Sequence, residues 1–123
     1  MRTNISGGSS FEPIIGFSRA VRAGNAVHLA GTGPVGADDQ DAAGQTRRIF
    51  AIAAEALAKA GCSLKDVVRT RMFLTCADDW EAVGRVHAEF FAEVRPAATM
   101  VVVAGLLNPA WRIEIEMDAV VPE

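Results

Sequence analysis

The chain contains few residues that could hold a metal ion or form a disulfide. Its two cysteines, Cys62 and Cys76, have neither a CxxC nor a zinc-ligand spacing, and two cysteines alone do not make a disulfide framework. Neither has a base or cation that the sequence predicts as its partner, so we predict inert, reduced thiols. The two histidines, His28 and His87, lie far apart, and no metal site is predicted. This cysteine usage fits a cytoplasmic protein.

Long apolar runs and a surplus of basic residues are also lacking. No run approaches the roughly 20 residues that span a bilayer, and no signal-peptide core follows Met1, so neither a membrane nor export is expected. The net charge is −3 with both signs interspersed, which argues against nucleic acid as a partner. The sequence Gly31-Thr32-Gly33 lacks the rest of a nucleotide-binding fingerprint.

The most informative stretch lies near the C-terminus. Residues 99–103 form a β-branched run between Pro96 and Gly105, which predicts a strand buried on both faces. Residues 111–118 then alternate strictly between apolar and charged side chains, as in a half-buried strand. The inward set is Trp111, Ile113, Ile115 and Met117, and the outward set is Arg112, Glu114, Glu116 and Asp118. A carboxylate beside a buried strand is where we expect chemistry.

Other segments have clear local signals. The Gly24-Asn25 pair between two short apolar runs predicts a β-hairpin. Residues 41–60 have helical periodicity and end before Gly61, and residues 67–75 predict a strand with Arg69 and Arg71 on one face. Asp78 and Glu81 form a capping-box pattern that predicts a second helix to about residue 94. Its predicted inward stripe is Trp80, Val83, His87, Phe90, Phe91 and Val94.

The predicted order is β-β-β-α-β-α-β-β within a single domain, residues 1–123. Both helix-containing crossovers are expected to be right-handed, to join parallel neighbouring strands and to place both helices on one face of a mixed six-stranded sheet. This is an α+β fold. The other face would be half apolar and bare, which predicts a closed homo-oligomer.

Several motifs together give the chain a resemblance to a known family. They are Ala30-Gly31 after the hairpin, Gln45-Thr46 and Ala60-Gly61 at the two ends of the first helix, residues 64–68, Trp80, Arg95-Pro96-Ala97 and residues 113–116. This set resembles the Rid (YjgF) family, whose older labels are endoribonuclease L-PSP and translation inhibitor. The resemblance implies a chorismate-mutase-like fold, a homotrimer and a small-molecule pocket between subunits. In the best-known branch, that pocket hydrolyses enamines and imines to 2-oxo acids and ammonia without metal or cofactor.

The pocket positions implied by the resemblance depart from that branch. Its carboxylate-binding arginine corresponds to Ala98, its tyrosine to Phe17, its serine to Ala30 and its helix asparagine to Gly84. Gly31 and Glu114 are retained. The resemblance gives Glu114 the role of positioning or activating the hydrolytic water, as a general base.

Four arginines are candidates to replace the missing one: Arg19, Arg69, Arg71 and Arg95. For Arg69 and Arg71 we favour cross-strand pairing with the acidic row, whereas Arg19 is as well explained by ligand binding as by a salt bridge. Arg95 could bind a ligand or the last helix carbonyls. His87 is more typical of a hydrogen-bonded core histidine than of a catalyst, and His28 is interpreted as structural.

The candidate site therefore combines one catalytic residue, Glu114, with a larger set of substrate-binding positions. That set is Phe17, Arg19, Ala30, Gly31, Gly84, His87, Arg95, Ala98, Thr99 and Met100, although core packing explains Thr99 and Met100 nearly as well. Three functions remain open: a cofactor-independent hydrolase of imine- or enamine-type metabolites, a non-catalytic metabolite-binding module, and an endoribonuclease or translation inhibitor. The negative charge fits the third poorly.

Overall fold

The computed structural model describes residues 1–123 as a sheet of six strands with two long helices. The strands are β1 (Arg2–Ile5), β2 (Ala20–Ala23), β3 (Ala26–Thr32), β4 (Val67–Leu74), β5 (Ala97–Val102) and β6 (Ile113–Val120). The helices are α1 (Ala42–Lys59) and α2 (Trp80–Phe91). Short helical turns occupy Glu12–Gly16, Leu64–Asp66 and Ala77–Asp79. None of the helices has the length and apolarity needed to cross a membrane.

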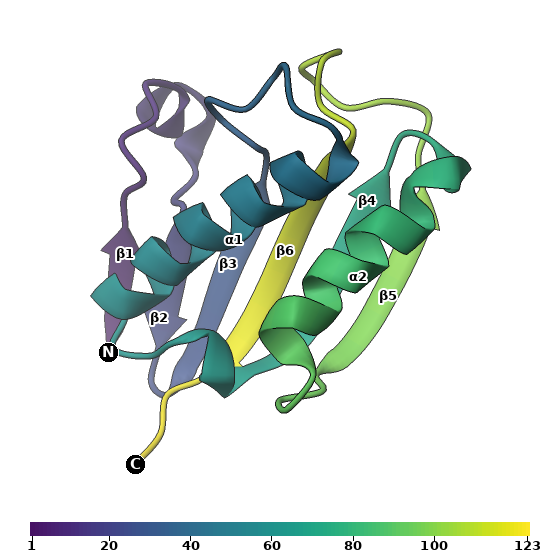
Figure 1. Cartoon of the computed structure of the whole chain (residues 1–123). Coiled ribbons are helices and arrows are strands. Elements are labelled where there is room, and N and C mark those ends of the chain that lie inside the picture. Colours follow the sequence, from purple (N-terminus) through teal and green to yellow (C-terminus); the bar gives the residue numbers. More distant parts are fainter.

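The strands lie in the order β1-β2-β3-β6-β4-β5, and both long helices cover the same face of the sheet (Figure 1). Only β4 and β5 are parallel, and the other neighbouring pairs are antiparallel. The predicted mixed sheet with both helices on one face is confirmed. The expectation that both crossovers join neighbouring strands was wrong for β3 and β4, because β6 lies between them and is paired with both.

Helix α1 forms as its sequence predicts. Asp41 is its N-cap, and the Oδ1 atom accepts a hydrogen bond of 2.8 Å from the backbone N–H of Gly44. After the helix, Gly61 has φ of +90°, a conformation that glycine adopts without strain. The apolar stripe, which includes Ile49, Ala53 and Leu57, is fully buried against the sheet.

The hairpin and β6 also follow their patterns. β2 and β3 flank the Gly24-Asn25 turn, where Gly24 has φ of +62°. Along β6, Ile113, Ile115 and Met117 are buried against the helices. The alternate residues of β6 therefore point to the face that α1 and α2 leave bare.

The start of α2 differs from the predicted capping box. No side chain caps this helix, and a single helical turn, Ala77–Asp79, precedes it. Asp79 binds Arg112 instead, so a tertiary ion pair replaces the local cap. Helix α2 ends at Phe91 rather than near residue 94.

The inward stripe predicted for α2 was partly wrong. Trp80 is 61% exposed, and Phe90 is 39% exposed. Val83, Val86 and Phe91 form the buried face. Trp80 is the first residue of the helix, beyond the area where α2 packs on the core.

The C-terminal stretch differs from its prediction at β5 and at Trp111. β5 is an edge strand rather than a strand buried on both faces, and Val101 and Val102 are 40% and 55% exposed. Trp111 lies in the loop before β6, not in the strand. A run of β-branched residues indicates a strand, but the strand is buried on both faces only where other elements cover both faces.

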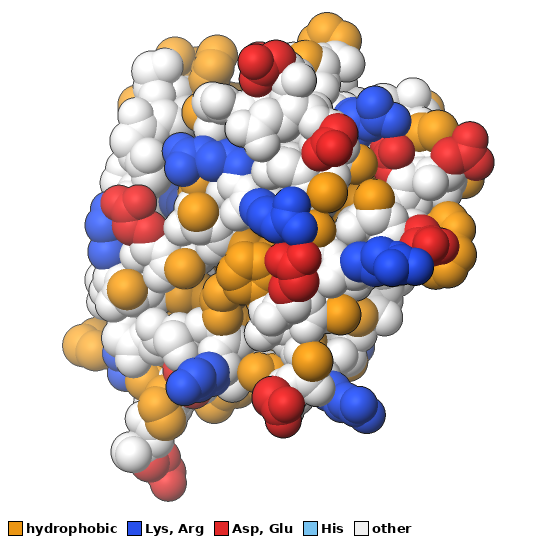
Figure 2. Space-filling view, viewed as in Figure 1, with side chains coloured by type: hydrophobic (Ala, Val, Ile, Leu, Met, Phe, Trp, Pro, Cys, Tyr) orange, Lys and Arg blue, Asp and Glu red, His pale blue; other side chains and the backbone are white.

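The helical face carries basic and acidic side chains interspersed with small apolar areas (Figure 2). One ion pair joins the two helices, with Arg47 Nη2 at 2.8 Å from Glu89 Oε1. This face therefore has no continuous basic stripe of the kind that binds phosphate backbones.

Candidate functional site

A hollow of about 870 Å³ lies at the end of β3, between the segment that precedes β2 and helix α1, and brings together part of the predicted site. Five predicted site residues line it: Phe17, Arg19, Ala30, Gly31 and Glu114. The remaining lining comes from the segment before β2, the end of β3, helix α1 and the loop before β6. These residues are Ser6, Gly7, Gly8, Ser9, Ser10, Phe11, Ile15, Thr32, Gly33, Val35, Arg48, Ile52, Glu55, Ala56, Lys59, Leu107, Asn108 and Trp111.

Glu114 is held against the backbone of β3. The pairing of β3 with β6 shifts register between Leu29 and Thr32, and this bulge places Gly31 directly against the Glu114 carboxylate. A Cβ atom on Gly31 would lie 2.5 Å from Glu114 Oε2 and 3.3 Å from its Cδ. Any side chain at position 31 would therefore displace the carboxylate from this place.

Burial raises the pKa of the Glu114 carboxyl above its usual value. The positive charge of Arg19 opposes this rise, and the negative charge of Glu116 adds to it. Desolvation is the largest cause. A raised pKa makes this carboxylate a stronger base than an exposed one and brings it closer to neutral pH, where both protonation states are available for general acid–base catalysis.

Arg19 lies in the same hollow with one side of its guanidinium fixed. Its Nη1 atom donates to Gly31 O at 2.9 Å and to Thr32 Oγ1 at 3.0 Å. The guanidinium carbon lies 5.4 Å from the centre of the Phe17 ring, a cation–π distance. Burial lowers the pKa of Arg19, while the charges of Glu12 and Glu114 raise it.

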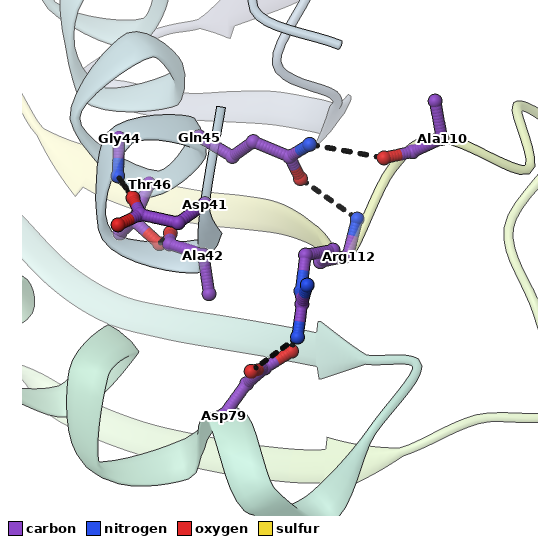
Figure 3. Close-up of polar contacts among 8 residues, drawn as sticks. All are labelled: Asp41, Ala42, Gly44, Gln45, Thr46, Asp79, Ala110 and Arg112. Carbon is purple, nitrogen blue, oxygen red and sulfur yellow. Dashed lines mark hydrogen bonds and ion pairs between the residues drawn. The ribbon is translucent and has the colours of Figure 1, made fainter. Parts of the chain in front are cut away.

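The loop before β6 is anchored by a buried glutamine. Gln45 Oε1 accepts from the backbone N–H of Arg112 at 2.7 Å, and Nε2 donates to Ala110 O at 2.9 Å (Figure 3). The Arg112 side chain continues the chain of contacts, with two bonds of 2.9 Å to Asp79 at the start of α2. Gln45 thus ties this loop to α1, and Arg112 ties it to α2.

Trp111 closes one side of the hollow. Its ring lies where a Cβ atom on Gly33 would be, so Gly33 is needed for this contact. Trp111 Nε1 donates to Asp38 Oδ1 at 2.9 Å, and Asn108 Nδ2 donates to Asp38 Oδ2 at 3.2 Å. The sequence analysis assigned Trp111 to a strand and did not find Asp38, because their contact joins two irregular loops.

Six predicted site residues do not reach the hollow. Gly84, His87, Arg95, Ala98, Thr99 and Met100 lie on α2, on β5 or between them, at the other end of the sheet. His87 Nε2 is 2.9 Å from Thr70 Oγ1, and its ring packs beside Phe50 and Phe91. Burial lowers the pKa of His87. These contacts are those of a hydrogen-bonded core histidine.

Arg95 also has a local partner. It has φ of +52°, and its Nε atom donates to Ala92 O at 3.1 Å. This contact satisfies a carbonyl at the end of α2. A Cβ atom on Gly84 would meet nothing within 4 Å, so that glycine faces open space.

The bare face of the sheet carries a row of charged pairs. Arg71 Nη1 lies 3.3 Å from Glu116 Oε1 and 3.2 Å from Asp118 Oδ2, which confirms its predicted cross-strand pairing. Arg69 is opposite Asp118 in the ladder but forms no ion pair. His28 Nδ1 is 2.7 Å from Asp118 Oδ1, a partner that sequence did not identify.

No group of three or more His, Cys, Asp or Glu side chains has an arrangement suited to a metal ion. Cys62 and Cys76 are both free. Burial raises the pKa of the Cys62 thiol, which disfavours the reactive thiolate. The ionisable groups that line the hollow are Arg19 and Glu114, together with Arg48, Glu55 and Lys59 of α1.

Comparison with known proteins agrees with this architecture. Residues 7–121 match the family model described as endoribonuclease L-PSP. The crystal structure of Rv2704 from Mycobacterium tuberculosis, described as a member of the YjgF/YER057c/UK114 family, superposes with a TM-score of 0.92 and 46% identity, covering 98% of this chain and 100% of that one. The fold class predicted from sequence is thereby confirmed.

Two curated relatives cover most of the chain. The uncharacterized protein SCO2049 of Streptomyces coelicolor is 39% identical over 119 residues, which are 94% of this chain and 89% of that protein. The 3-aminoacrylate deaminase RutC of Acinetobacter baylyi is 38% identical over 108 residues, 84% of this chain and 85% of that protein. With a family model over almost its full length and relatives at this identity, the chain belongs to the endoribonuclease L-PSP family, also named after YjgF.

Proposed function

We propose that this protein is a cofactor-independent hydrolase of imine- or enamine-type metabolites, with Glu114 as its general base. The observation that carries the proposal is the Glu114 carboxylate, half-buried against Gly31 in a hollow that also contains Arg19. A relative with 38% identity is named as a 3-aminoacrylate deaminase, which supports a deaminase-type reaction. The particular substrate is part of the proposal.

The proposed reaction needs only a proton acceptor that later becomes a donor. Ionised Glu114 removes a proton from water as the water oxygen attacks the imine carbon, and the C=N bond becomes a single bond to nitrogen. Protonated Glu114 then gives its proton to that nitrogen, which leaves a hydroxyl group and an amino group on the same carbon. Glu114 next takes the hydroxyl proton and passes it to the amino nitrogen, the C–N bond breaks, ammonia leaves, and the oxygen forms the carbonyl. The raised pKa of Glu114 suits both steps.

We further propose that the functional form is a homotrimer with the site at a subunit interface. The sheet face opposite α1 and α2 is bare in one chain, and edge strand β5 exposes Val101 and Val102. Another copy placed over this surface would cover it. The same assembly would bring Ala98, Thr99 and Met100 of one copy toward the hollow of the next. Light scattering after size exclusion should give three times the chain mass.

The test of catalysis is imine hydrolysis in competition with semicarbazide. Imines are generated from a panel of amino acids, and the protein should lower the amount of semicarbazone formed. Glu114→Gln should reduce the rate by at least about 100-fold, within the usual range for loss of a general base. Glu81→Gln removes the same charge from an exposed ion pair with Arg85 and is the matched control. Equal rates for Glu114→Gln and the unchanged protein would refute the proposal.

One specific observation favours a second function, a non-catalytic binding module. Ala98 stands where the deaminase branch has its arginine, and Phe17 lacks the hydroxyl of the corresponding tyrosine. Saturable binding of 2-oxo acids with no hydrolysis of any imine would support this alternative. RNA cleavage that survives Glu114→Gln and repeated purification would instead support the activity in the family's older name.

A further inference from the structure

We infer that Arg19 is the carboxylate-binding residue of this site and that the hollow selects 2-imino acids with a branched or aromatic side chain over three-carbon ones. This inference rests on the proposed function, because it names the class of substrate for that site. The ligand carboxylate would thus bind to Arg19, the residue directly before β2, rather than to position 98, where the deaminase branch has its arginine and this chain has Ala98.

The geometry of Arg19 leaves half of its guanidinium available. Nη1 is occupied by Gly31 O and Thr32 Oγ1, whereas Nε and Nη2 have no protein partner. Since no fully buried side-chain nitrogen in the structure lacks a partner, neither of these two nitrogens is fully enclosed by the protein. The bonds to β3 and the ring of Phe17 hold the plane of the group. A guanidinium fixed on one edge and open on the other is suited to a two-bonded carboxylate.

Arg19 also has no ion-pair partner within the chain. It forms no ion pair within 4.0 Å. Glu12, the nearest acid in sequence, uses Oε2 to accept from Gly7 N and Ser9 N. Glu114 shares the hollow but forms no ion pair with Arg19 within 4.0 Å. A ligand carboxylate on Arg19 would therefore pair a half-buried cation and leave Glu114 free to act on the adjacent carbon.

The rest of the hollow offers apolar contacts to the ligand's side chain. Phe11, Ile15, Val35, Leu107 and Trp111 line it, and the first four are 59%, 67%, 57% and 98% exposed. Large apolar side chains left this exposed around a hollow mark a place where an apolar group binds. Each further methylene buried there should strengthen binding by up to about fourfold. A three-carbon ligand would leave these contacts unused.

The experiment is calorimetric binding of stable 2-oxo acids, which resemble the hydrolysis products. The probes are 2-oxopropanoate, 4-methyl-2-oxopentanoate and the amide of the latter. The branched acid should bind at least about tenfold more tightly than the three-carbon acid, because it adds three carbons to bury. It should also bind at least about tenfold more tightly than its own amide, which has no charge to pair with Arg19.

Variants then assign the charge to one residue. Arg19→Gln should weaken binding of the branched acid at least about tenfold and leave binding of the amide nearly unchanged. Arg85→Gln removes an equal charge from the exposed surface of α2 and should change neither. Because Arg19 also binds the bulge, folding of the variant is checked by circular dichroism. If it does not fold, the comparison of acid and amide on the unchanged protein decides.

Equal affinity for the acid and the amide, or for the branched and the three-carbon acid, would overturn the inference. Failure of the proposed function has a different signature. Arg19-dependent binding of the branched acid without hydrolysis of its imine would refute the reaction and leave the anion site standing. Imine hydrolysis with a KM that Arg19→Gln does not change would refute the anion site and leave the proposed reaction standing.

Discussion

Replacing Gly31 by alanine should lower the activity of the protein while its stability stays nearly unchanged. The added Cβ would lie 2.5 Å from Glu114 Oε2, so the carboxylate must move by about 0.9 Å to reach ordinary contact at 3.4 Å. The atom displaced is the end of a flexible side chain, and Gly31 does not have a positive φ, so the backbone accepts alanine. We expect the free energy of unfolding to change by no more than about 1 kcal/mol. A misplacement of this size should lower kcat/KM about 100-fold.

Two measurements check this prediction. Urea denaturation gives the stability of Gly31→Ala, and semicarbazide-competed imine hydrolysis gives its activity. Gly105→Ala is the matched control, because a Cβ atom there meets nothing within 4 Å. It should keep its activity. A folded Gly31→Ala protein with unchanged kcat/KM would refute the argument that the position of the Glu114 carboxylate controls the reaction.

Three further predictions concern charge and buried hydrogen bonds. The fold raises the pKa of Glu114 above its ordinary value of 4.5, so ionisation of this carboxyl opposes folding above 4.5, and fully above the raised pKa. Glu114→Gln should therefore unfold at higher urea than the unchanged protein at pH 7, and the difference should shrink as pH falls through the raised pKa and vanish below about 4.5. The kcat/KM of the unchanged protein should fall as pH drops through the raised pKa. Gln45→Ala removes two buried bonds and should cost about 2–4 kcal/mol of unfolding free energy in urea. Asp79→Ala breaks the pair with half-exposed Arg112 and should cost about 1–2 kcal/mol, measured in the same way.

The parts of the fold predicted correctly are those with local signals. Asp41, the apolar stripe and Gly61 define α1 within its own sequence. The turn at Gly24 does the same for the hairpin, and the alternation of residues 113–118 does so for β6. In each of these cases the signal lies within the element that it specifies, and no contact from a distant part of the chain competes with it.

The errors arose where a distant residue decides the structure. The predicted capping box of Asp78 and Glu81 does not form, because α2 begins after Asp79, whose side chain binds Arg112, 33 residues away in the sequence, instead of capping the helix. The order of the sheet places β6 between β3 and β4, and no property of the crossover helices specifies this insertion. The exposure of β5 depends on its place at the sheet edge.

The sequence predicted individual residues of the candidate site but not the contacts between them. The alternation in β6 identified Glu114 as a charged residue on the bare face, and the resemblance added Gly31. The contact between Gly31 and Glu114 depends on a register shift in β3, and no pattern in the sequence predicts this shift. The half-occupied guanidinium of Arg19 likewise depends on that bulge, because its partners are the backbone and side-chain oxygens at Gly31 and Thr32.

The distance between β5 and the hollow distinguishes a site formed within one chain from a site shared by two copies. β5 is three strands away from β3, which is about 14 Å at the usual spacing between strands. A small 2-imino acid on Arg19 and Glu114 therefore cannot also contact Ala98 or Thr99 of the same chain. Any contribution from those positions requires a second copy. Binding that depends on β5 of another subunit would be lost when the assembly is dissociated, whereas the Arg19 contact, built from β2, β3 and Phe17, would persist in the single chain.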